Sequence, residues 1–134
     1  DDVFYASLHG DPNDMFPHFL GWAEETGEGA GEGCNANYPM PPGTGFDVWS
    51  RAFEDACEKI TAFGAEAIVI SHGVDTYEND PISFFKLKHP DYVTYGKRIA
   101  DLGLPTVFLM EGGYAVEEIG INTVNVLQGF ESGV

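Results

Sequence analysis

Short apolar segments alternate with amphipathic segments over residues 46–130, and no other feature of the sequence constrains the fold as strongly. The apolar runs at 67–71 and 106–110 predict two buried strands. Helices are predicted over 46–64, 91–103 and 115–130. In the first helix, the apolar residues that recur at spacings of three and four are Val48, Trp49, Ala52, Phe53, Ala56, Ile60 and Phe63. Strands that alternate with helices are typical of a parallel sheet covered by helices, so we expect an α/β fold.

The ends of the first two helices carry capping residues. Asp47 is the predicted N-cap of the first helix, and Gly64 occupies the position that follows its last turn. Asp91 is the predicted cap of the second helix, and Gly103 is its predicted stop. These residues set the expected helix boundaries.

The N-terminal third is less regular. The apolar and aromatic run at 3–9 predicts a further buried strand, and residues 10–45 form a long loop rich in Gly and Pro, with a short strand at 35–40. Phe16, Phe19 and Trp22 indicate that part of this loop packs. Loops of this length in compact domains are usually functional or disordered.

Charge excludes some partners. The formal net charge is -16, and Arg51 is the first basic residue. Nucleic acid is therefore not an expected partner, because phosphate binding needs clustered Lys and Arg. A cationic ligand suits this charge, and solubility in a salty habitat explains the acidity equally well. Cys57 lies on the apolar helix face and is expected to be a buried thiol. No apolar run is long enough to predict a transmembrane helix, so a membrane is not an expected partner.

Three loops follow the carboxyl ends of the predicted strands, where ligands bind in open parallel sheets. They come after His9, Ser71 and Met110. The second loop carries Asp75, and a carboxylate there can ligate a metal, act as a base or cap the next helix. Capping or turn formation is the default interpretation of this residue taken by itself.

The third loop, "EGGY", contains Gly112, Gly113 and Tyr114. Paired glycines permit positive φ and a close backbone approach. A tyrosine there can donate its hydroxyl to a developing oxyanion, or it can pack on the start of the next helix.

Several stretches together resemble the zinc-dependent histone deacetylase and acetylpolyamine amidohydrolase family: "FYASLHGDP", "NYPMPPGTG", "FGAEAIVISHGVDTYENDPISFFKL" and "MEGGY". The resemblance covers nearly the whole chain, taken as a single domain at 1–134, and matches the C-terminal part of the family's catalytic domain. It implies an arginase/deacetylase-type fold of three layers, with helices on both faces of a parallel sheet, here incomplete. It also implies a cytoplasmic bacterial protein.

The resemblance implies a role for several residues. Asp75 matches a zinc ligand, and Tyr114 matches the tyrosine that stabilises the transition state. The positions that match potassium ligands are Ser7 and Leu8, and those that match the substrate channel are Phe16, Gly112 and Gly113.

The chain departs from the family pattern in one respect. The Asp-x-His zinc ligands and the His-His pair of the family do not occur in it, and we expect a fragment or a processed product. One carboxylate cannot hold a catalytic zinc, which needs three protein ligands. We therefore predict that the chain alone binds no zinc and is catalytically incompetent, while potassium remains an implied cofactor.

Three functions are weighed. The first is part of a deacetylase that, once completed, hydrolyses a small cationic acetylated amine or an acetyl-lysine peptide. The second is a non-catalytic remnant that acts as a binding or dimerising module, and a homodimer is the expected assembly because incomplete sheets expose edges and apolar faces. The third is an arginase-like amidohydrolase, which the absence of a two-metal ligand pattern disfavours.

Overall fold

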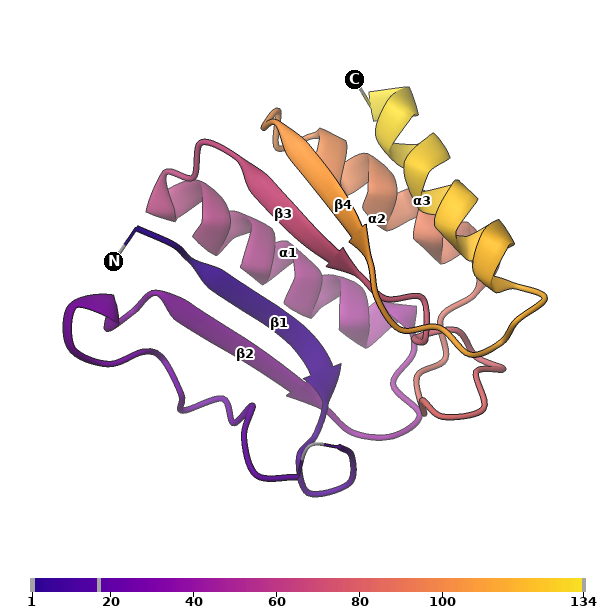
Figure 1. The fold of residues 1–134 in the computed structure, drawn as a ribbon, viewed down its shortest axis with the longest axis horizontal. Helices are drawn as coiled ribbons and strands as arrows, with labels where there is room; N and C mark the ends of the chain where they lie inside the picture. The colour runs from indigo at the N-terminus through magenta and orange to yellow at the C-terminus, as the bar shows by residue number, and fades with distance from the viewer. Residues whose placement is uncertain (1, 17, 134) are drawn as a thin grey trace. The chain divides into compact units, whose positions relative to one another are not determined.

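A computed structural model of the chain describes residues 2–16 and 18–133, and these fall into two compact units. Unit 1 is Asp1–Ala65 and unit 2 is Glu66–Val134. Each unit contains one pair of parallel strands and at least one helix (Figure 1). The prediction of a single domain stays a prediction. No helix within the described ranges is long and apolar enough to span a bilayer.

Unit 1 is built on two parallel strands and one long helix. β1 (Tyr5–Gly10) pairs with β2 (Asn35–Met40), with Tyr5 opposite Asn35 and Gly10 opposite Met40. The short strand predicted at 35–40 is therefore confirmed. A 3₁₀ turn, η1 (Gly29–Gly31), lies in the connection between the strands. Phe16 and Phe19 in the same connection are 85% and 74% exposed, so these two aromatic side chains do not pack, whereas Trp22 is half-buried and Pro12 fully buried.

α1 (Phe46–Phe63) packs against both strands of unit 1. Its buried residues are Trp49, Ala56 and Cys57, which confirms the predicted buried thiol. Gly64 ends the helix in the left-handed conformation at φ 80°, as predicted. Asp47 is not the N-cap. The N-cap is Gly45, two residues earlier, and Asp47 lies in the first turn of the helix, where its negative charge interacts favourably with the helix dipole.

Unit 2 contains β3 (Ile68–His72), α2 (His89–Ala100), β4 (Thr106–Met110) and α3 (Ile119–Gly133). β3 and β4 are parallel, as predicted. Ring contacts of His72 with Tyr95, and of Phe108 with Phe130, join the strands to α2 and α3. The other face of β3 and β4 is less buried than predicted. Its exposed side chains are Val69 at 66%, Val107 at 54% and Leu109 at 48%.

The helix boundaries of unit 2 differ from the prediction in two places. α2 begins at His89, so Asp91 is not its N-cap but caps it from inside, where its Oδ2 accepts the N–H of Lys88 at 2.7 Å. α3 begins at Ile119 and not at residue 115, because a turn closed on the carbonyl of Ala115 comes first. The stop at Gly103 is confirmed by its left-handed φ of 66° just after α2.

α2 and α3 lie side by side in Figure 1 and approach each other through glycines. A Cβ at Gly96 would lie 2.2 Å from the carbonyl oxygen of Val126, and one at Gly129 would lie 2.1 Å from that of Val93. Real Cβ atoms do not approach backbone so closely, so the two helices pack at this distance only because both positions lack a side chain.

Replacing Gly129 by Ala should therefore force the two helices apart. We expect a loss of about 1–3 kcal/mol in the free energy of unfolding, measured by urea denaturation. Gly120→Ala, in the same helix, is the matched control, because no atom lies within 4 Å of the position its Cβ would take. The control should be neutral or stabilising by up to about 1 kcal/mol. Equal losses in both variants would show that the close approach is not the cause.

His72 provides a second test of the core of unit 2. The residue is 2% exposed, its Nε2 has no hydrogen-bond partner among the described residues, and burial lowers the pKa of its imidazole. The folded state therefore favours the neutral ring, and stability should be lost as the pH falls through about 6.5, where the unfolded chain binds the proton. In His72→Leu, the loss of stability between pH 7.5 and pH 5.5, measured by urea denaturation, should be smaller than in the parent. An unchanged pH dependence would contradict the prediction.

Candidate functional site

The candidate site is formed by the two loops that follow β3 and β4. The strand ends are adjacent, with His72 opposite Met110, and the N–H of Glu111 donates to the carbonyl of His72 at 3.1 Å. Parallel pairing therefore starts both loops at the same edge of the sheet. This is the edge at which such folds bind ligands.

Gly112 lies next to both predicted chemical groups, the carboxylate of Asp75 and the ring of Tyr114. A Cβ at this position would lie 2.6 Å from Oδ2 of Asp75 and 3.6 Å from Cε2 of Tyr114. The carbonyl of Gly112 also accepts the N–H of Val74 at 2.7 Å. The carboxylate of Asp75 and the ring of Tyr114 thus border the same backbone position, although 38 residues lie between them in the sequence.

Gly113 can only be a glycine. Its φ is 156°, and a Cβ there would lie 2.6 Å from Cγ2 of Val74. Both glycines of "EGGY" therefore allow the turn at 111–114, which we call the tyrosine turn, to lie directly against the loop that follows β3 and carries Asp75, which we call the Asp75 loop.

Tyr92 of α2 forms hydrogen bonds with the Asp75 loop. Its ring is fully buried, and its hydroxyl lies 3.0 Å from Oγ1 of Thr76 and donates to the carbonyl of Val74 at 3.3 Å. Burial raises the pKa of Tyr92, so its hydroxyl stays protonated and can keep donating. The residues on both sides of Asp75 are anchored in this way.

The Asp75 carboxylate lies in an environment that disfavours its charge. Burial raises its pKa, and the negative charge of Asp80 raises it further. A cation bound next to it would relieve both effects, so this carboxylate is suited to ligate one. Tyr114 is 46% exposed and can present its phenol to a bound molecule.

Asp80 has a role that the sequence did not reveal. The sequence pattern assigns it no part in the site, whereas its Oδ2 accepts the N–H of Tyr114 at 2.8 Å. The segment "NDP" signals a turn, and Oδ1 of Asp80 does accept the N–H groups of Ile82 and Ser83. No sequence pattern indicates the bond to the other loop.

The remaining predicted site residues lie in unit 1. The hydroxyl of Ser7 is 2.8 Å from Nδ1 of His9, and Leu8 pairs with Tyr38 across the strands. Phe16 follows β1 on an exposed loop. Their roles as potassium ligands and channel residue stay predictions.

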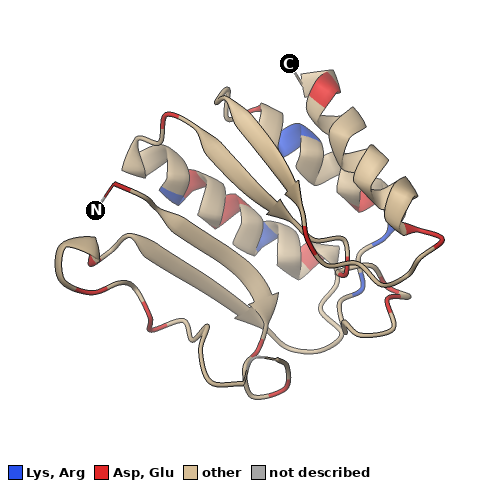
Figure 2. Ribbon diagram, viewed as in Figure 1, with Lys and Arg blue, Asp and Glu red and all other residues tan. Residues whose placement is uncertain are grey.

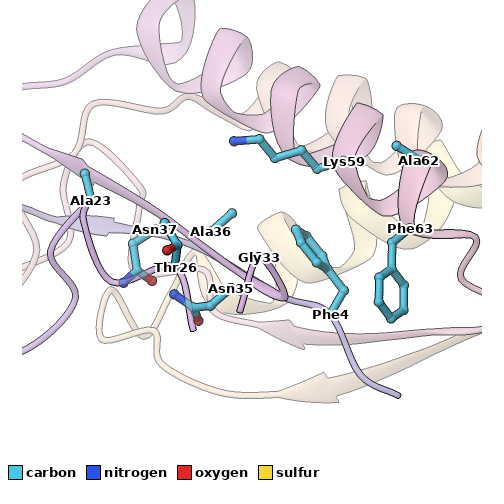
Figure 3. A pocket seen from close by; sticks show the side chains of 10 residues that line it. All are labelled: Phe4, Ala23, Thr26, Gly33, Asn35, Ala36, Asn37, Lys59, Ala62 and Phe63. Atoms are coloured by element: carbon cyan, nitrogen blue, oxygen red, sulfur yellow. The ribbon is translucent and has the colours of Figure 1, made fainter. Parts of the chain in front are cut away.

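Unit 1 also holds two open cavities. The one in Figure 3, of about 440 Å³, is lined by Phe4, Phe63 and Lys59 among others, and Lys59 already forms an ion pair with Asp55 at 2.9 Å. The second, of about 730 Å³, includes Ser7 in its lining. Neither cavity contains Asp75 or Tyr114, so we assign the candidate chemistry to the loops of unit 2 and not to the cavities.

The described residues do not by themselves fit a catalytic zinc. Among residues 2–16 and 18–133, no three His, Cys, Asp or Glu side chains are grouped so that they could hold a metal ion. Asp75 can supply one ligand, whereas a catalytic zinc needs three from the protein.

The comparisons with known proteins identify the family. The model of the histone deacetylase domain matches residues 1–130, so the chain belongs to the histone deacetylase family. Acetylpolyamine amidohydrolase 1 of Pseudomonas aeruginosa is 64% identical over 98% of the chain, and the acetylpolyamine amidohydrolase of Mycoplana ramosa is 64% identical over 96%. The chain spans only 38% of the length of each of these relatives.

Solved structures confirm the predicted fold class. The crystal structure of an acetylpolyamine aminohydrolase from Burkholderia pseudomallei matches 98% of the chain with a TM-score of 0.96 and 36% identity, and the chain covers 39% of it. A histone deacetylase homologue from Aquifex aeolicus matches 99% of the chain with a TM-score of 0.87 and 29% identity, and the chain covers 36% of it. The chain is thus a part of the arginase/deacetylase-type α/β fold.

The environment of Asp75 leads to a titration test. In the metal-free chain, its carboxyl should titrate above the ordinary range of an Asp, because burial and Asp80 both favour the protonated form. The deprotonated folded state is disfavoured accordingly, so the contribution of Asp75 to stability decreases as the pH rises through its pKa. The measurement is an NMR titration of the side-chain carboxyl carbon. Asp55, whose pKa is lowered mainly by its hydrogen bond with Lys59, is the internal control. A lower midpoint for Asp75 than for Asp55 would contradict the prediction.

Proposed function

We propose that the complete protein containing these 134 residues hydrolyses acetyl amides, and that this segment supplies Asp75 and Tyr114 to its active site. The observation that carries the proposal is the position of both side chains next to Gly112, in a chain that belongs to the histone deacetylase family. Zinc, when bound, would polarise the acetyl carbonyl and activate water. Asp75 would supply one of its ligands, and segments outside this chain would supply the others.

Tyr114 would donate its phenol hydrogen to the oxygen of the acetyl group as negative charge develops there. A preorganised donor of this kind stabilises the transition state more than the ground state, and therefore raises kcat. Gly112 and Gly113 would allow the backbone to come close to the substrate, because neither carries a side chain. Asp75 would bind the metal ion, because a bound cation would offset the cost of burying its charged carboxylate.

An acetylated polyamine or an acetyl-lysine peptide is the proposed substrate class. The matched relatives from Pseudomonas aeruginosa and Mycoplana ramosa are named as acetylpolyamine amidohydrolases. Figure 2 shows acidic positions along the connection between β1 and β2, and the first fifty residues contain no Lys or Arg. A surface of this charge raises the local concentration of a cationic substrate.

We also propose that the 134 residues alone have no deacetylase activity, because Asp75 is one ligand where three are needed. The alternative function is a non-catalytic module that binds a partner or forms a homodimer. Exposed apolar residues of α3 favour it, namely Ile121, Val124 and Leu127. A complete protein that is inactive and dimeric by light scattering would support this alternative.

Tyr114→Phe tests the proposed function. In the complete protein, kcat on an acetylated polyamine should fall by about 10²–10³ with KM little changed, because one oxyanion donor is lost. Steady-state kinetics measure this. Tyr5→Phe, at an exposed position of β1, is the matched control and should keep the activity of the parent. Full activity of Tyr114→Phe, or turnover by the 134 residues alone, would be evidence against the assignment.

A further inference from the structure

We propose that Asp80 is a positioning residue for Tyr114, and this inference rests on the proposed function. Asp80 is 8% exposed, and its Oδ2 accepts the backbone N–H of Tyr114 at 2.8 Å. The two residues belong to different loops and lie 34 positions apart. The carboxylate thus ties the tyrosine turn to the loop that carries Asp75.

The two oxygens of Asp80 have separate tasks. Oδ1 accepts the N–H of Ile82 at 2.9 Å and that of Ser83 at 3.0 Å, which closes the turn within its own loop. Oδ2 bonds to Tyr114 in the other loop. A residue needed only as a local turn former would use Oδ1 alone. The bond from Oδ2 is therefore the observation that separates positioning from simple turn formation.

The tyrosine turn depends on such a bond because two glycines precede it. Gly112 and Gly113 have more accessible backbone conformations than other residues, so they do not by themselves hold Tyr114 in one place. The turn is fixed on one side by the N–H of Val74, which donates to the carbonyl of Gly112 at 2.7 Å. Asp80 fixes it on the other side through the N–H of Tyr114.

A charged acceptor suits this task. Hydrogen bonds to a carboxylate are stronger than those between neutral groups, and a buried carboxylate needs several donors to offset the loss of its hydration. Asp80 has three backbone donors, from Ile82, Ser83 and Tyr114. The charge of Asp80 also acts on Asp75, so the exchange of the Tyr114 N–H is the readout that reports the position of Tyr114 by itself.

Asp80→Asn separates the two tasks. The side-chain oxygen of the amide would keep facing the two donors Ile82 and Ser83, and its NH2 group would face the N–H of Tyr114, where donor meets donor. We expect amide hydrogen exchange at Tyr114 to be faster by about tenfold or more, because a bond to a charged group is lost. NMR of the complete protein measures this without requiring activity.

Asp91→Asn is the matched control. Asp91 lies in the same unit, and its carboxylate also accepts a backbone N–H, that of Lys88 at 2.7 Å. The control therefore loses the same charge next to a backbone donor, at the start of α2, while its amide oxygen can still accept the N–H of Lys88. Exchange at Tyr114 and kcat should both stay within about twofold of the parent. Unchanged exchange at Tyr114 in Asp80→Asn, or an equal increase in the control, would overturn the proposal.

A double-mutant cycle tests the functional part. Asp80→Asn should lower kcat by about tenfold with KM changed less than about twofold, and should cause no further loss in the Tyr114→Phe background, because residues that act as a unit are not additive. An equal loss in both backgrounds would show that Asp80 acts on the fold or on Asp75 and not through Tyr114. If the complete protein has no deacetylase activity, the proposed function fails, and the exchange experiment alone decides whether Asp80 positions Tyr114.

Discussion

The parallel pairing of β3 with β4 is the constraint on which the candidate site depends. Because the carboxyl ends of paired parallel strands meet at one edge, the loops that follow them must start side by side. Asp75 and Tyr114 are far apart in the sequence, and this pairing brings their loops together. A slip of one residue in the register would turn the side chains of one strand to the opposite face and would misalign the loops.

Three hydrogen bonds then refine this arrangement. The carbonyls of His72 and Gly112 and the carboxylate of Asp80 each accept an N–H from the facing loop. α2 supports the same edge, because the hydroxyl of its Tyr92 forms hydrogen bonds with Thr76 and with the carbonyl of Val74, on both sides of Asp75. Such polar contacts hold loops whose composition would otherwise leave them mobile, and binding and catalytic residues are usually placed on loops held by a rigid scaffold.

Membership of the histone deacetylase family and the local geometry support each other. The family relation explains why a tyrosine follows paired glycines at a strand end, and the geometry shows which carboxylate that tyrosine accompanies. The described residues nevertheless contain no group of three metal-binding side chains at this edge, whereas a catalytic zinc needs three protein ligands. This is the ground for the proposal that the segment would contribute one ligand and one oxyanion donor to a larger active site.

The sequence by itself determined the helices, the strands and the two glycines, because periodicity and turn chemistry are local properties. It also pointed to Asp75 and Tyr114. Helix starts were misplaced at Asp47, Asp91 and residue 115, since capping depends on hydrogen bonds that composition does not show. Only the tertiary structure revealed Asp80 as the partner of Tyr114 and the glycine contact of α2 with α3. Both contacts join residues that are distant in the chain and that packing brings together, and a local sequence pattern does not show which distant residues will meet.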